Sequence, residues 1–460
     1  MSTPAPGRRT AEPARRSRVD ATVRLAVGLP LLVVLAALLV RPGDVARTGS
    51  GPEETALART TVICPSGEGG VVAATDLDAA GAVTVRQGKK EEPLRLAARR
   101  PTRVGSGEAP VVLDAEGELA PGLVAGRAGS PQVAPECRPP VFDEWFTGVG
   151  AGAKHSSVLE LVNPDAGPAI VDTLVYGARG PVDAPRLRGV AVPGRSVVRI
   201  DLARAVPRRD ELSLHVTTTR GRVTASVLDT YDELGRGRSA TDYLAPQPAP
   251  ATANLLLGLP EGRGRRVLLL TNPSESETRA TVKVVTEESV FTAVGSRAVV
   301  VPPQSVARVS ISPLLRGRNA RDALGLLVES AAPVTATARL FVGGDVTHLV
   351  PPPMLTETSL VVPRGAKRLT LALAARAGVV QVVSRAADGR VVADEHVEVD
   401  PGRGAVLDLP GAAELVTVST NGVEVAGTVL VAGDGDAVLR LRPVVRSGLV
   451  ADVRPGLPSA

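Results

Sequence analysis

The feature that most constrains the fold is a segment that returns at a fixed spacing. LELVNP at Leu159–Pro164 reappears as LLLTNP at Leu268–Pro273, which places Asn163 and Asn272 109 positions apart. A constant offset over a long stretch is typical of one structural unit used twice. Other residues keep the same spacing, namely Pro193 with Pro302, Ser196 with Ser305 and Arg199 with Arg308.

A shorter third copy is predicted after the second. Its segments are KRLTLALAARAGVVQVVS, EHVEVDPGRGAVLDL and LVTVSTNGVEVAGTVLV, in the same order as their counterparts. Pro401 takes the position of Pro302, and Val423 takes that of Val334. This copy lacks the Asn–Pro pair.

Each copy is predicted to consist of β-strands. Runs such as VVRIDL, TASVLDTY and TATARLFV place apolar residues at every second position. Gly, Pro, Asn and Asp interrupt the runs roughly every 8 to 12 residues, the rhythm of an antiparallel sandwich. Aromatic residues make up 2% of the chain, so the cores must be aliphatic. The predicted fold class is all-β, with tandem immunoglobulin-like antiparallel β-sandwich domains after a single N-terminal transmembrane helix.

The Asn–Pro pairs are interpreted as turns. Proline donates no ladder hydrogen bond and biases the preceding residue toward extended geometry, so Asn163–Pro164 and Asn272–Pro273 end strands well. The alternative is that Asn163 and Asn272 bind a ligand or act in catalysis.

An apolar run near the N-terminus predicts a membrane anchor. Residues 25–40 are sixteen uninterrupted apolar residues between Arg24 and Arg41. A helix of that length spans roughly 24 Å, and flanking arginines can extend its reach. A cleaved signal peptide is the competing interpretation. Arginine is enriched before the run, so the N-terminus is placed in the cytoplasm and the bulk outside it, as a single-pass cell-membrane protein.

The distribution of charge argues against nucleic acid as a partner. The sequence has 53 Lys and Arg against 48 Asp and Glu, but residues 1–24 alone hold six arginines against two acids. The rest of the chain is therefore nearly neutral, whereas binding to a phosphate backbone needs a concentrated basic face.

The two cysteines are predicted to form a disulfide. Cys64 and Cys137 both follow the anchor, and an oxidising compartment allows them to pair. Two unpaired buried thiols are the alternative. A metal site is disfavoured because no histidine stands beside them.

The segment VFDEWFTGVGAGAKHSS contains the single Trp and a Gly-x-Gly-x-Gly run. A phosphate-binding glycine loop is followed by a helix, but here a predicted strand follows. Trp145 and Phe146 are therefore expected to pack at a seam between domains or to form an exposed binding patch.

The predicted domains follow from the repeats and the cysteines. They are 1–24, a cytoplasmic basic tail; 25–41, the transmembrane anchor; 42–60, a linker; 61–140, a small disulfide-closed β domain; 141–250, 251–356 and 357–445, the three sandwich repeats; and 446–460, a C-terminal tail.

Several motifs together indicate a known family. They are the anchored basic tail, Cys64–Pro65, EWFTGVG at 144–150, SSVLELVNP at 156–164, VPGRSVVRI at 192–200 and GRSATDYLAP, which includes Tyr243. With these motifs the sequence resembles the actinobacterial proteins grouped as domain of unknown function 5719. The likeness covers most of residues 60–445. The resemblance implies an actinobacterial origin and an envelope setting, but no reaction and no functional residues.

No catalytic, cofactor-binding or metal-binding motif is recognised. The four histidines, His155, His215, His348 and His396, are interpreted as ordinary surface residues, and the acidic DLD and GDGD segments as hairpin turns. The predicted function is a non-catalytic structural or docking component of the cell envelope, with an unidentified protein or envelope partner. The alternative is a glycan-binding or accessory factor in polysaccharide assembly.

Overall fold

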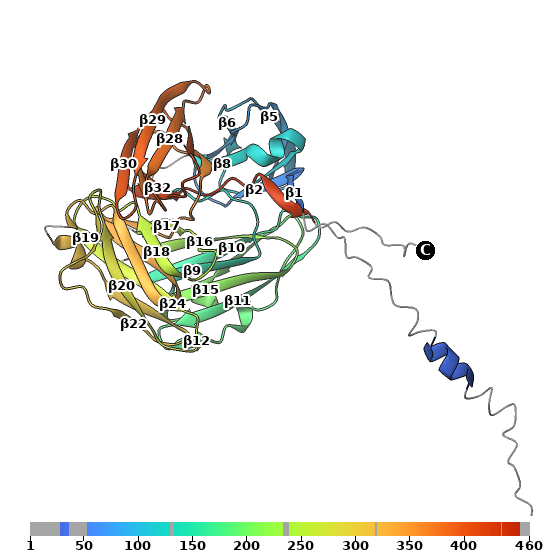
Figure 1. Cartoon of the computed structure of the whole chain (residues 1–460), viewed down its shortest axis with the longest axis horizontal. Helices are drawn as coiled ribbons and strands as arrows, with labels where there is room; N and C mark the ends of the chain where they lie inside the picture. The colour runs from blue at the N-terminus through green and yellow to red at the C-terminus, as the bar shows by residue number, and fades with distance from the viewer. Residues whose placement is uncertain are drawn as a thin grey trace, which may run out of the picture. The chain divides into compact units, whose positions relative to one another are not determined.

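The computed structural model describes residues 28–35, 53–128, 133–232, 239–317, 320–433 and 435–450. These belong to two units, one before Ala56 and after Gly448, the other Ala56–Gly448. The described residues form an all-β protein with several antiparallel sheets (Figure 1).

In the first unit, residues 28–35 form a short helix. No helix in the described ranges has both the length and the apolar character needed to cross a membrane. The rest of the predicted anchor 25–41, the tail 1–24, residues 42–52 and residues 451–460 lie outside the described residues. β1 (Glu53–Ala56) pairs with β34 (Ser447–Val450).

The cysteine-containing segment forms two small sheets around one core. One sheet has the order β2-β7-β4-β5 and the other β6-β3-β8. Cys64 and Cys137 form a disulfide inside this core. The elements are β2 (Arg59–Cys64), β3 (Gly70–Thr75), β4 (Gly81–Gln87), β5 (Lys90–Leu96), β6 (Thr102–Ser106), β7 (Val111–Glu116), η1 (Gly117–Gly122) and β8 (Leu123–Ala128).

The first copy of the repeat forms a nine-stranded sheet system with the path β12-β11-β15-β9-β10-β16-β17, to which β13 and β14 add at the side. The elements are β9 (Asp143–Ala151), β10 (His155–Val162), β11 (Ala169–Gly177), β12 (Gly180–Val182), η2 (Pro185–Leu187), β13 (Val190–Val192), β14 (Val197–Asp201), α2 (Leu202–Ala205), β15 (Arg209–Arg220), β16 (Thr224–Tyr231) and β17 (Ala240–Leu244).

The second copy forms an eight-stranded system with the path β21-β20-β24-β19-β23, to which β18, β22 and β25 add. The elements are β18 (Ala251–Leu257), β19 (Gly264–Asn272), β20 (Thr278–Val285), β21 (Val290–Thr292), β22 (Val299–Val301), β23 (Ser305–Ser310), η3 (Leu314–Arg316), β24 (Gly325–Val342) and β25 (Asp345–Leu349).

The segment predicted as the third copy separates into two four-stranded sheets, β26-β31-β28-β29 and β30-β27-β32-β33, around a shared core. Several of these strands appear in orange to red in Figure 1. The elements are β26 (Glu357–Val361), β27 (Ala366–Ala372), β28 (Gly378–Arg385), β29 (Val391–Val399), β30 (Gly404–Leu409), β31 (Leu415–Thr420), β32 (Ala426–Ala432) and β33 (Asp436–Arg440).

The strand registers reproduce the spacing of the sequence repeat. In the first copy Val158 faces Asp201, and in the second Val267 faces Ser310, so both partners move by 109 positions. The hairpin pairs Val175 with Val182 and Val284 with Phe291 keep the same offset. The repeat in the sequence is therefore a repeat of strand pairing.

The copies differ where one long strand replaces two. In the first copy Gly221, at φ +75°, separates β15 from β16. In the second copy β24 continues for 18 residues, and its two halves pair with different neighbours, β18 and β20 first and then β19 and β25. The alternating burial of β20, with Ala280, Val282 and Val284 inward, shows how each strand supplies one face to an aliphatic core.

Candidate functional site: a buried charge network and an arginine-lined cavity

The two repeated asparagines fasten turns. Asn163 Nδ2 donates to the carbonyl oxygens of Gly167 at 2.8 Å and Val192 at 3.1 Å, and its Oδ1 accepts from the Asp165 N–H at 2.9 Å. Asn272 makes the corresponding bonds to Ser276, Val301 and Ser274 at 2.7, 3.2 and 3.0 Å. Both side chains are buried. Each asparagine thus ties the turn after its strand to the end of a neighbouring strand.

Trp145 and Phe146 point to different places. Trp145 stacks on His215 with ring centroids 4.1 Å apart, and it packs with Val267 and Leu269 of the second copy. Phe146 packs inside the core of the first copy and not at this seam. Because neighbouring side chains on a strand face opposite sides of the sheet, the two aromatics could not share one surface.

The glycine run lies in β9 and makes room for its neighbours. Gly148 has a φ of +98°, and a Cβ there would lie 2.7 Å from Leu269 Cδ1 of the second copy. A Cβ at Gly150 would overlap the ring of His155. These glycines are needed for close packing in a strand.

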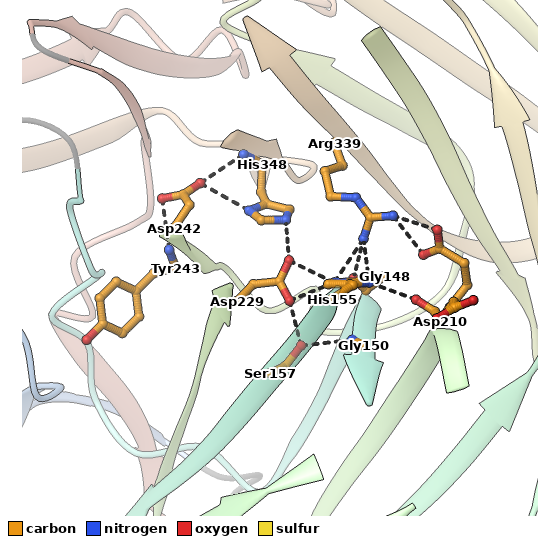
Figure 2. Close-up of polar contacts among 11 residues, drawn as sticks. Gly148, Gly150, His155, Ser157, Asp210, Asp229, Asp242, Tyr243, Arg339 and His348 are labelled. Carbon is orange, nitrogen blue, oxygen red and sulfur yellow. Dashed lines mark hydrogen bonds and ion pairs between the residues drawn. The ribbon is translucent and has the colours of Figure 1, made fainter. Parts of the chain in front are cut away.

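Asp229, on β16, is the centre of a buried polar network (Figure 2). It lies 2.8 Å from His155 Nε2 and accepts a 2.5 Å hydrogen bond from Ser157 Oγ. His348 Nε2 lies 3.1 Å from its Oδ2, as an ion-pair contact without hydrogen-bond alignment. Burial would raise the pKa of Asp229, but His155 and His348 outweigh it and lower that pKa.

His348, on β25, lies between two carboxylates. The backbone N–H of His348 donates to Asp242 Oδ2 at 2.9 Å, and the ring Nδ1 of His348 lies 3.1 Å from the same oxygen. Burial would lower the pKa of His348, but Asp229 and Asp242 together raise it to about 9. The imidazole is therefore held as a cation at neutral pH.

Arg339, on β24, continues the network toward the first copy. Its Nη2 donates to both carboxylate oxygens of Glu211 at 2.6 and 2.8 Å, and its Nη1 donates to the Gly148 carbonyl at 3.1 Å. Nη1 also lies 3.1 Å from His155 Nε2. Arg339 has no exposed surface, so this ion pair joins strands of the two copies inside the protein.

The arrangement does not match a Ser–His–Asp triad. In a triad the hydroxyl donates to the histidine, whereas here Ser157 Oγ and His155 Nε2 both contact the Asp229 carboxylate. His155 is 2% exposed and His348 5%. The described cavity that touches His348 measures about 20 Å³, enough for about one water and no substrate. The network therefore acts inside the protein.

The interpretation of the four histidines as surface residues holds for His396 and was wrong for His155 and His348. His155 and His348 are buried, His215 is partly buried, and only His396 is exposed. Burying a charged imidazole requires carboxylate partners, and these come from strands β16 and β17, far from either histidine in the sequence.

A second group of ion pairs joins the segment around Cys137 to the repeats. Glu136 accepts two hydrogen bonds from Arg440, both at 2.7 Å, and Arg138 pairs with Glu144 of the EWFTGVG segment. Burial would raise the pKa of Glu136, but Arg440 and Arg442 lower it to about 2. The third copy is thus bound to the N-terminal part by buried charges.

Several segments that carry the family resemblance meet at the turn after Cys64. Glu160 accepts from the Ser66 N–H at 2.9 Å and from Arg199 Nε at 2.8 Å. The Tyr243 hydroxyl donates to the Ser66 carbonyl. Arg127 adds hydrogen bonds to five backbone carbonyls, those of Pro65, Gly67, Gly69, Gly107 and Ala109. The motifs therefore encode an internal junction.

A large cavity lies elsewhere and is open. Its volume is about 1230 Å³, and it is bordered by the loop that precedes β19, the segment around η3, and residues of β27 and β32. Its lining includes six arginines, which are Arg263, Arg265, Arg266, Arg316, Arg321 and Arg368. Sequence reasoning missed this site, although GRGRR at 262–266 was a visible signal.

The fold and these sites define an all-β protein of antiparallel sheets with one disulfide and internal networks of buried charge. No group of three or more His, Cys, Asp or Glu that could hold a metal occurs among the residues with described positions. A family described as "Family of unknown function (DUF5719)" matches residues 98–410, more than half of the chain. The chain belongs to this family. No curated protein matches the sequence.

Proposed function

We propose that this chain is a non-catalytic structural or docking component of the cell envelope of an actinobacterium. In this proposal a single helix within residues 25–41 anchors it in the cytoplasmic membrane, and tandem immunoglobulin-like sandwiches stand outside. Its partner is a protein or another envelope component.

The observation that carries the proposal is that the charged and titratable side chains of these networks contact one another inside the protein. In the His155–Asp229–His348 network, the Glu211–Arg339 pair and the Glu136–Arg440 pair, the histidines, Asp229 and both arginines are buried, and Glu211 and Glu136 are partly buried. Groups that could act in catalysis are thus committed to holding the copies together. A chain whose charged groups hold its own strands together is suited to presenting its outer surface to a partner.

The disulfide supports the extracytoplasmic placement. Cys64 and Cys137 are paired, and structural disulfides persist in oxidising compartments. The sixteen-residue apolar run between Arg24 and Arg41 supports the anchor.

Protease accessibility in spheroplasts tests this placement. The full chain would carry one epitope at its N-terminus and a different one at its C-terminus. We expect added protease to remove the C-terminal epitope from intact spheroplasts and to leave the N-terminal one until detergent is added. A C-terminal epitope that survives in intact spheroplasts, in cells where an external control protein is digested, would contradict the proposal.

A further inference from the structure

The arginine-lined cavity has a composition that differs from the rest of the chain. Beyond residue 24 the sequence is nearly neutral, yet this cavity gathers six arginines against three acids, Glu261, Glu287 and Asp322. Like charges held close together repel, so such a group is most stable when an anion neutralises it.

Some of these arginines have structural duties. Arg368 pairs with Glu261 at 2.7 Å and with Asp408 at 3.1 Å. Arg266 Nη2 donates to the carbonyls of Pro260 and Gly262, and burial lowers its pKa. These two arginines shape the wall of the cavity.

Other arginines are available to a ligand. Arg263 and Arg321 are exposed, and neither has a hydrogen bond or ion pair with any residue of described position. The guanidinium of Arg265 lies over the Phe341 ring, 4.0 Å from its centroid, which fixes its position. A guanidinium presents a planar fork of donors that matches phosphate or carboxylate groups.

The repeat shows that the fold does not require all of these charges. With the offset of 109, Arg265 and Arg266 correspond to Ser156 and Ser157 of the first copy, whereas Arg263 corresponds to another cation, Lys154. Arg266 shapes the cavity wall, so Arg265 is the charge that the strand itself does not need.

The remaining lining indicates what else the ligand carries. Glu287 and Asp322 have no ion pair with a described residue, and Ser310, Ser312 and Thr370 also border the cavity. Carboxylates accept hydrogen bonds from hydroxyl donors, which a sugar chain supplies. The lining has no aromatic side chain on which a nucleic-acid base could stack. The volume of about 1230 Å³ exceeds that of most small-molecule sites, which are about 300 to 1,000 Å³.

We propose that this cavity binds an acidic oligosaccharide through several phosphate or carboxylate groups, with Arg263, Arg265 and Arg321 as the main anion contacts. This inference rests on the docking role proposed above. It adds the chemical class of the molecule that is docked.

Binding to the full-length chain in nonionic detergent tests the inference. The probes are a fluorescent oligogalacturonate for carboxylates, a fluorescent oligo(glycerol phosphate) for phosphates, a neutral glucan oligomer and a single-stranded oligonucleotide of matched length. The variant Arg263→Gln with Arg321→Gln removes two cavity charges. The matched control, Arg279→Gln with Arg390→Gln, removes two exposed arginines that do not line the cavity.

We expect one or both acidic sugar probes to bind and the neutral glucan not to bind. The cavity variant should weaken binding at least about tenfold, a loss of about 1.4 kcal/mol, while the control variant stays within about twofold. The probe that binds identifies the acidic group. Absence of binding by both acidic probes, equal weakening in the two variants, or tighter binding of the oligonucleotide would overturn the inference. The protease test of the extracytoplasmic location does not depend on these binding measurements. Its outcome therefore distinguishes a failure of the binding inference from a failure of the proposed function.

Discussion

Glu211 on β15 and Arg339 on β24 form a bidentate ion pair at 2.6 and 2.8 Å, in which the arginine has no exposed surface. The two residues are 128 positions apart and belong to different copies of the repeat. The pair therefore links the copies through the protein interior.

Removing the carboxylate from this pair should destabilise the chain strongly. Glu211→Ala leaves the Arg339 guanidinium buried without its counter-charge, and the free energy of unfolding should fall by about 3 to 5 kcal/mol. Urea unfolding followed by circular dichroism measures the change. Glu277→Ala, which removes the partner of exposed Arg279, is the control and should change it by less than about 1 kcal/mol. A loss below about 1 kcal/mol in Glu211→Ala would show that the pair does not hold the copies together.

Because of His348, the free energy of unfolding should fall as the pH rises into the alkaline range. Its pKa is about 9 in the folded chain against about 6.5 unfolded, so its contribution is fully present below pH 6.5 and is lost as the pH rises through 9. The contribution is on the order of 3 kcal/mol. As the pH rises from 6 to 10, the free energy of unfolding should fall for the native chain and should change less for His348→Gln. Parallel profiles for the two chains would refute this assignment.

Loss of the disulfide should also lower stability. On the chain-entropy account, the link between Cys64 and Cys137, separated by 73 residues, contributes about 4 kcal/mol. Cys64→Ser combined with Cys137→Ser should reduce the unfolding free energy by that order, measured by urea titration without reductant. An unchanged midpoint in the double variant would exclude a stabilising role.

The repeated asparagines should be energetically equivalent. Asn163→Ala and Asn272→Ala each remove the same buried turn contacts, so each should cost about 1 to 3 kcal/mol. Asn421→Ala, at an exposed position, is the control and should be nearly neutral. A loss in only one of the two repeat variants would mean that the turns have different roles.

The sequence was sufficient to predict the features that follow from local pattern and from repetition, namely the repeated module, the strands and the disulfide. The offset between Asn163 and Asn272 predicted a repeated module, and the strand registers keep that offset. Alternation predicted strands, and the cysteines that were expected to pair form a disulfide.

The contacts that depend on distant strands were not predictable. The pairing of β16 with β10 brings Asp229 to His155, whereas His348 on β25 reaches Asp229 and Asp242 from a different sheet. Alternation along β9 places Trp145 and Phe146 on opposite sides, but which of them faces the second copy depends on how the sheets pack. The cavity forms between the second and third copies, so no single segment reveals its walls, although the cluster at Arg263, Arg265 and Arg266 marked one of them.

The most direct test of the internal role of the charge network is histidine modification by diethylpyrocarbonate, read by mass spectrometry on the folded and the urea-unfolded chain. His155 is 2% exposed, whereas His396 is an exposed residue of β29. We predict that His396 is modified rapidly in the folded chain while His155 reacts only after unfolding. Modification of His155 as fast as His396 in the folded chain would show that the network is open to solvent and would contradict the account.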